Sequence, residues 1–114
     1  MKYYLVFLFS LYFNCLNAHI CYIKQENNKI IVYNCDNSNK SIYIGNSQLI
    51  GYNDDYIVIK ESHYIKIYNI NGVVNGSFYL NDDEQVEHMG CEYIVIKNNY
   101  MVKYYNYSGK QVRV

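Results

Sequence analysis

The sequence predicts an all-β protein, an antiparallel β-meander of about three repeats that follows an N-terminal signal peptide. The pentapeptide Tyr-Ile-Val-Ile-Lys occurs at residues 56–60 and again at residues 93–97, an offset of 37 residues. Ile, Val and Tyr favour the pleated, half-buried surfaces of sheets. Ala and Leu are scarce beyond residue 18, which leaves little helix-forming material. Repetition and composition therefore both indicate β-structure.

Residues 1–18 have the pattern of a signal peptide. Lys2 supplies a positive charge, and residues 3–13 are a continuous apolar run that is too short for a membrane span. Cleavage after Ala18 is the natural site, although Cys15 leaves a lipidated anchor as an alternative. The mature domain is then 19–114, without a second apolar span, and it is secreted or located in the periplasm or cell envelope.

The repeat extends well beyond the pentapeptide. Nine of the 17 positions from Tyr56 to Gly72 are identical 37 residues later. A weaker copy lies upstream, where residues 31–34 correspond to residues 66–69, and Ile23-Lys24 corresponds to Ile59-Lys60. The predicted copies are residues 20–44, 48–80 and 85–114, because internal similarity at a fixed period defines structural units.

Each copy contains strands in a fixed order. Residues 56–60 are almost wholly apolar, as in a strand covered on both faces, and residues 64–68 alternate with a period of two. Glu61-Ser62 and Asn98-Asn99 suit the tight turns between these strands. Gly72 and Gly109 end the next strand, since glycine tolerates positive φ. A third strand is expected up to Leu80 and a short fourth one near residues 48–50 and 85–86.

This pattern, above all "YIVIK…YIKIYNINGVV" with its closing Asn-x-x-Gly turn, resembles a blade of a β-propeller. Propellers typically close with four to eight blades, whereas this chain holds about two and a half copies. The resemblance therefore implies one of two arrangements. Either the sheets form a compact sandwich or barrel, or other subunits or a protein partner complete a partial propeller.

Charge and motifs argue against several classes of function. Ten basic and ten acidic side chains balance, without the basic stripe on which nucleic-acid binding depends. The sequence has no phosphate-binding loop, metalloprotease motif or nucleophile elbow. We expect a non-catalytic protein that contacts a protein partner, a surface or a second copy of itself. A hydrolase of unknown type is one alternative.

The cysteines predict a disulfide. If the first hairpin turns at Asn27-Asn28, Cys21 and Cys35 lie close together, and an oxidising compartment would let them pair. The alternative pairing joins Cys21 to Cys91, because both cysteines stand at the start of equivalent strands.

A copper site is the second functional alternative. Cleavage after Ala18 would give His19 a free amine beside its imidazole, a combination that binds copper. It resembles the start of small periplasmic copper-carrier β-sandwiches, with His63 or His88 as the further ligand. We otherwise expect no cofactor.

Tyrosines form the last candidate site. Tyr64, Tyr68, Tyr104 and Tyr105 lie on predicted strands, where they could form a recognition surface for a glycan or a peptide. Ordinary sheet packing and A/T-rich codons explain tyrosines equally well, so both interpretations stay open.

Overall fold

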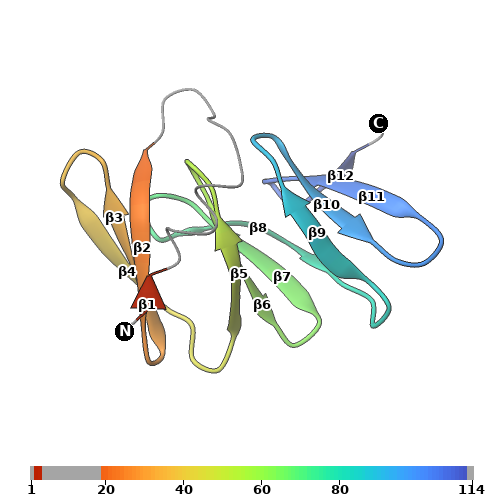
Figure 1. Ribbon diagram of the computed structural model, residues 1–114, viewed down its shortest axis with the longest axis horizontal. Helices are drawn as coiled ribbons and strands as arrows, with labels where there is room; N and C mark the ends of the chain where they lie inside the picture. The colour runs from red at the N-terminus through yellow and green to blue at the C-terminus, as the bar shows by residue number, and fades with distance from the viewer. Residues whose placement is uncertain (1, 4–18, 113–114) are drawn as a thin grey trace.

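The computed structural model describes residues 2–3 and 19–112, and every regular element in them is a β-strand. The strands form three four-stranded antiparallel sheets, each in simple meander order (Figure 1). The first sheet contains β1 (Lys2–Tyr3), β2 (Ile20–Glu26), β3 (Lys29–Asn34) and β4 (Asn39–Tyr43). The second contains β5 (Gln48–Tyr52), β6 (Ile57–Glu61), β7 (Tyr64–Tyr68) and β8 (Val74–Tyr79). The third contains β9 (Gln85–Met89), β10 (Tyr93–Lys97), β11 (Val102–Asn106) and β12 (Gln111–Val112).

The predicted all-β class is therefore confirmed, and a sandwich-like arrangement fits. The described strands do not close into a barrel, so that alternative was wrong. Each sheet beyond β1 falls within one of the three segments predicted from the sequence, because short turns let each strand pair with its neighbour in the chain.

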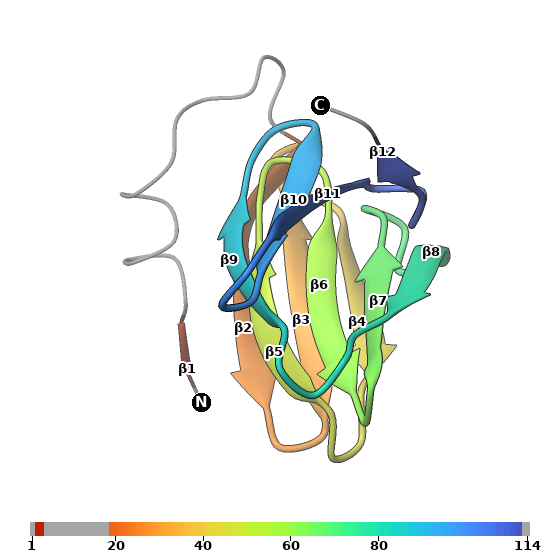
Figure 2. The same ribbon diagram turned by 90° about the vertical axis from the view of Figure 1, so that its right-hand side faces the viewer.

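The three sheets stack face to face in chain order with the second in the middle, as Figure 1 shows, and Figure 2 looks through this stack from the side of the third sheet. One apolar cluster fills the space between the first and second sheets, and a separate cluster fills the space between the second and third. Ile57 and Ile59 of β6 belong to the first cluster, whereas Val58 belongs to the second, and all three are fully buried. Alternation along one strand therefore supplies both cores, as the apolar run at residues 56–60 predicted.

A turn of one geometry follows the third strand of each sheet, namely β3, β7 and β11. It begins at an asparagine whose backbone N–H donates to the carbonyl four residues later, at 2.9 Å in each sheet. The fourth residue of each turn has a positive φ, namely 74° at Asn37, 77° at Gly72 and 86° at Gly109. Glycine at the last two positions avoids the cost of a left-handed backbone.

These two glycines should respond differently to substitution. An alanine Cβ at Gly72 would lie 3.5 Å from the Ile42 side chain, an ordinary contact, so Gly72→Ala should lose only about 1 kcal/mol from the positive φ. At Gly109 it would lie 2.5 Å from the backbone oxygen of Ser77 in β8 and force the two sheets apart. We expect Gly109→Ala to cost about 2 kcal/mol in urea unfolding. Equal losses would contradict the close approach of the third sheet to β8.

The register corrects three details of the sequence-based prediction. Glu61 pairs with Tyr64, so the tight turn is Ser62-His63, one residue later than predicted. Asn98 likewise donates to Met101, which moves the turn in the third sheet to residues 99–100. In the first sheet the pair Ile23 and Val32 faces the second sheet, as Val58 and Ile67 face the third. Structurally equivalent residues of the first and second copies are therefore 35 residues apart. The sequence matched Ile23 with Ile59 instead, but Ile59 faces the first sheet rather than the third.

Cys21 and Cys35 form a disulfide, with their Cα atoms 5.0 Å apart. The β2–β3 hairpin turns at Asn27-Asn28 as expected, and the register shifts at Cys21, so that Ile20 rather than Cys21 lies opposite Asn34. Cys91 is also disulfide-bonded, and the described part of the chain contains no free cysteine. The alternative pairing of Cys21 with Cys91 was therefore wrong.

The predicted signal peptide lies outside the described residues except for Lys2–Tyr3, which form β1 at the edge of β2. Cleavage after Ala18 stays a prediction, and it would remove β1 and make β2 the edge strand. Within residues 2–3 and 19–112, no helix of the length and apolarity needed to cross a membrane occurs.

Candidate functional site

The four candidate tyrosines do not share one surface, although Tyr64 and Tyr68 point to the same face of β7. Tyr68 is buried against the first sheet, and Tyr105 stacks on Phe78 between the second and third sheets with ring centroids 3.8 Å apart. Tyr64 is half exposed and contacts the Tyr79 ring edge-on. Tyr104 lies on the far side of the third sheet, because neighbours in a strand point to opposite faces. The structure therefore does not gather the four rings on one face.

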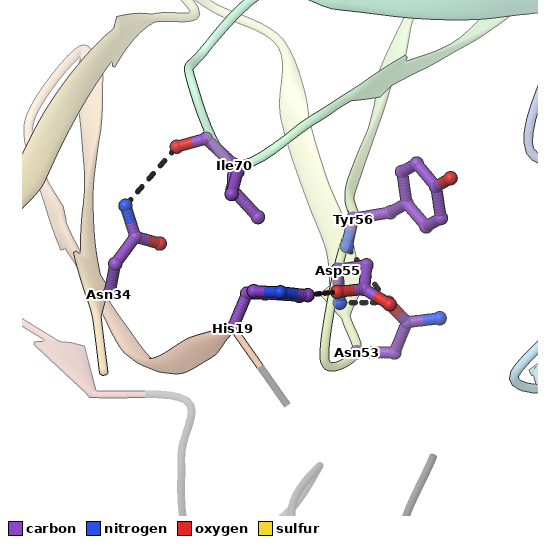
Figure 3. Close-up of polar contacts among 6 residues, drawn as sticks. All are labelled: His19, Asn34, Asn53, Asp55, Tyr56 and Ile70. Carbon is purple, nitrogen blue, oxygen red and sulfur yellow. Dashed lines mark hydrogen bonds and ion pairs between the residues drawn. The ribbon is translucent and has the colours of Figure 1, made fainter. Parts of the chain in front are cut away.

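The candidate histidines are also separated. His19 Nδ1 lies 2.5 Å from Asp55 Oδ1, before β6 (Figure 3), whereas His63 follows β6 and lies 3.2 Å from Asp82. His88 is exposed in β9. No group of three His, Cys, Asp or Glu side chains that could hold a metal ion occurs among residues 19–112. Copper binding through the terminal amine of His19 stays a prediction.

Asn53 connects the turn before β6 to the third sheet. Its side-chain oxygen accepts hydrogen bonds from the backbone of Asp55 and Tyr56 (Figure 3). Its side-chain nitrogen donates to the Gly90 carbonyl at 2.9 Å and to the Tyr107 hydroxyl at 3.0 Å. Asn53 is fully buried, and this satisfied network has a structural role.

The outer face of the third sheet is not packed against another of the described sheets. Val95 of β10 lies opposite Tyr104 of β11, and Lys97 lies opposite Val102. These side chains point away from the second sheet, because Ile94 and Ile96 of the same strand occupy the apolar cluster. Val102 is 49% exposed and Tyr93 is 40% exposed, so this face presents apolar side chains to solvent. We call it the outer face and define it by Tyr93, Val95, Lys97, Val102 and Tyr104.

A cleft of about 370 Å³ opens between the first and second sheets at the end where β4 joins β5. The β4–β5 loop supplies Gly45 and Ser47, and Tyr43 stands at its rim. The second sheet supplies Lys66 and Tyr68. Lys66 Nζ lies 2.6 Å from Glu61 Oε1, and both side chains are more than a third exposed.

At the corresponding place between the second and third sheets, the lysine has a buried carboxylate as its partner. Lys103 lies opposite Ile96 just as Lys66 lies opposite Ile59. Lys103 Nζ forms a 2.7 Å ion pair with Glu84 in the loop before β9. The Glu84 side chain is only 3% exposed, and it also accepts a 2.9 Å hydrogen bond from the backbone N–H of Asn81.

The two lysine pairs have shifted pKa values. Burial alone would raise the pKa of Glu84, but hydrogen bonds from Lys103 and Asn81, together with the Lys103 charge, lower it overall. The hydrogen bond to Glu84 raises the pKa of Lys103, and the hydrogen bond to Glu61 raises that of Lys66. Both lysines are therefore charged at neutral pH.

Lys66 and Lys103 are among the positions that are identical at the repeat offset of 37 residues. The sequence analysis did not predict that their partners differ. A signal was present, because Gln48 and Gln85 match at the repeat offset and are preceded by Ser47 and Glu84 respectively. The cleft thus lies where the two copies differ in the residue before the matching glutamine. Searches against protein-family models, curated proteins and solved structures find no match to this chain.

Proposed function

We propose that this is an exported, non-catalytic protein that acts through protein–protein contact, and that a second copy of the chain covers its outer face. One observation carries the proposal. The pentapeptide Tyr-Ile-Val-Ile-Lys is packed on both faces in β6, where Val58 is fully buried, but on one face only in β10, where Val95 remains partly exposed. The third sheet thus has the composition of a sheet that is covered on both sides.

The direction of stacking supports a second copy as the occupant. The face of the second sheet that holds Val58 and Ile67 packs on the face of the third that holds Ile94 and Ile96. At the other end of the stack, Ile31 and Tyr33 lie on the face of the first sheet opposite to its buried Ile30 and Val32. The two end faces are therefore the two halves of one kind of interface, which is the geometry of a head-to-tail contact.

Two copies would assemble six sheets. Head-to-tail contacts close into rings when the rotation between subunits permits, and closed propellers typically hold four to eight four-stranded blades. A dimer of this chain falls within that range. The propeller-like pattern of the sequence and the open outer face therefore support the same assembly.

Export is supported independently of the outer face. The Cys21–Cys35 disulfide fits an oxidising compartment, where such bonds persist. The predicted signal peptide at residues 1–18 agrees with secretion or with a place in the periplasm or cell envelope. A first sheet that begins at β2 after cleavage would enter the assembly without β1.

Native mass spectrometry of the exported protein tests the assembly. We expect a dimer at about 50 μM, a concentration at which an interface of micromolar affinity is largely occupied. Val102→Asp places a carboxylate in the interface and should give a folded monomer.

Val73→Asp is the matched control, since Val73 is 58% exposed in the turn before β8, away from the outer face. It should remain dimeric. A wild-type protein that is folded and monomeric at this concentration, or a Val102→Asp dimer as stable as wild type, would overturn the second copy as the partner.

A further inference from the structure

The two interfaces between sheets treat equivalent lysines differently. In the interface between the second and third sheets, the Glu84 carboxylate fills the space beside Lys103 and is almost fully buried. In the interface between the first and second sheets, the corresponding space beside Lys66 is part of the 370 Å³ cleft. The chain therefore supplies a buried carboxylate to Lys103 but leaves the corresponding space beside Lys66 open.

The residue that precedes the matching strands β5 and β9 explains the difference. Ser47 directly precedes β5 and Glu84 directly precedes β9, so the two residues occupy the same position before matching strands. In each loop this residue donates its backbone N–H to the carbonyl three residues earlier, Ile44 in one case and Asn81 in the other. The two turns share this hydrogen bond but differ in backbone conformation, since Gly45 has a φ of 58° and no residue from 80 to 84 has a positive φ. The carboxylate is missing beside Lys66 because serine stands where the other loop has glutamate.

Lys66 retains donors for another partner. A lysine ammonium has three N–H donors, and Glu61 in the β6–β7 turn is its acceptor at 2.6 Å. The Glu61 side chain is 53% exposed, and ion pairs at such exposure contribute little net free energy. A competing carboxylate would therefore displace Glu61 from Lys66 at small cost.

We propose that this cleft binds the carboxylate group of a small organic ligand, with Lys66 as its cationic partner, in the place that Glu84 occupies beside Lys103. Tyr43 and Tyr68 line the same cleft, and their rings suit a ligand whose carboxylate is attached to an apolar or aromatic body. The volume lies within the range of small-molecule sites. This site is independent of the outer face.

NMR titration of the ¹⁵N-labelled full chain tests the proposal with two matched probes. N-acetyltyrosine carries the carboxylate, and N-acetyltyrosinamide replaces it with a neutral amide of nearly the same shape. We expect the acid to shift the amide resonances of Ser47 and Lys66 with millimolar affinity and the amide to bind at least about tenfold more weakly, since one charge-assisted hydrogen bond is lost.

Three variants should change the affinity for N-acetyltyrosine: two should weaken binding and one should strengthen it. Lys66→Gln removes the cation, and Ser47→Glu supplies an internal carboxylate as Glu84 does, so each should weaken binding of the acid about tenfold. Glu61→Gln removes the competing carboxylate and should tighten binding about threefold. Because a tighter-binding variant must be folded, this result also controls for damage to the structure.

Two further probes distinguish the source of the carboxylate. Acetyl-Gly-Tyr with a free terminus represents the end of a peptide chain, and glucuronate represents a sugar acid. If either probe binds more tightly than N-acetyltyrosine, and Ser47→Glu abolishes this binding, the result supports the site and identifies its class of ligand. Equal binding of N-acetyltyrosine and its amide, or no carboxylate-dependent shift for any acid up to about 20 mM, would overturn it.

Discussion

Val58→Asp is expected to unfold the protein, whereas Val95→Asp in the identical pentapeptide is expected to leave it folded. Val58 is fully buried between the second and third sheets, among Ile65, Ile67 and Ile94. A carboxyl group without a partner at such a position costs several kcal/mol whether it is ionised or protonated, and the lost apolar packing adds to this, against a total of roughly 5–15 kcal/mol that stabilises a small domain. Val95 points to the outer face, where water solvates the new charge, so its replacement should cost no more than about 1 kcal/mol.

Circular dichroism and urea unfolding at low protein concentration measure both effects. Low concentration matters because Val95→Asp also removes an apolar side chain from the proposed interface with a second copy. If both variants unfold, the outer face is a buried surface of the monomer. If both remain folded, the second sheet is not covered on both faces.

Glu84→Ala is the second variant with a large expected effect. We expect it to lower the free energy of unfolding by about 3 kcal/mol. Removal of one partner from a buried ion pair leaves the other charge poorly compensated, and such losses begin near 3 kcal/mol. Lys103 is 22% exposed and recovers some hydration, which keeps the loss at the lower end of that range. Glu61→Ala breaks the equivalent pair with Lys66 at the surface and should cost less than about 1 kcal/mol.

The contribution of Glu84 should also depend on pH in a defined direction. Its pKa is lower in the folded than in the unfolded state, so the stabilisation is complete above the unfolded value of about 4.3. It is lost as the pH falls through the folded pKa. The difference in urea midpoint between wild type and Glu84→Ala should therefore be large at pH 7 and shrink below about pH 4. A constant difference would exclude the ionised pair as its cause.

Most of the fold was predictable because periodicity and repetition are local properties of the sequence. The apolar run at residues 56–60 predicted a strand covered on both faces, and Gly72 and Gly109 predicted the ends of strands. The asparagine turn of the first sheet was harder to recognise, since Asn37 replaces glycine at its positive φ. The one-residue error in the hairpin turns arose because Glu61 and Asn98 suit turns but belong to the pairs that precede them.

The candidate sites were less predictable, because they depend on how the sheets face each other. Tyr104 and Tyr105 are adjacent in the sequence and lie on opposite faces, which no composition argument separates. The pairing of Cys21 with Cys35 was accessible, since a hairpin brings its ends together. The cleft beside Lys66 was not, because a loop of one sheet and a strand of the next must meet to form it.

The pentapeptide that recurs in β6 and β10 has a consequence for how the chain folds. Nothing in these strands distinguishes β7 from β11 as a partner, so the choice depends on the short turns, which bring the correct neighbour close at a far smaller loop-closure entropy than the distant one. When two chains meet, the entropic advantage of the neighbouring strand over a strand of the other chain falls as the protein concentration rises. Exchange of whole hairpins would then preserve every strand pair while linking the molecules, a characteristic failure of repetitive proteins. Dilute refolding should therefore favour the native monomer fold.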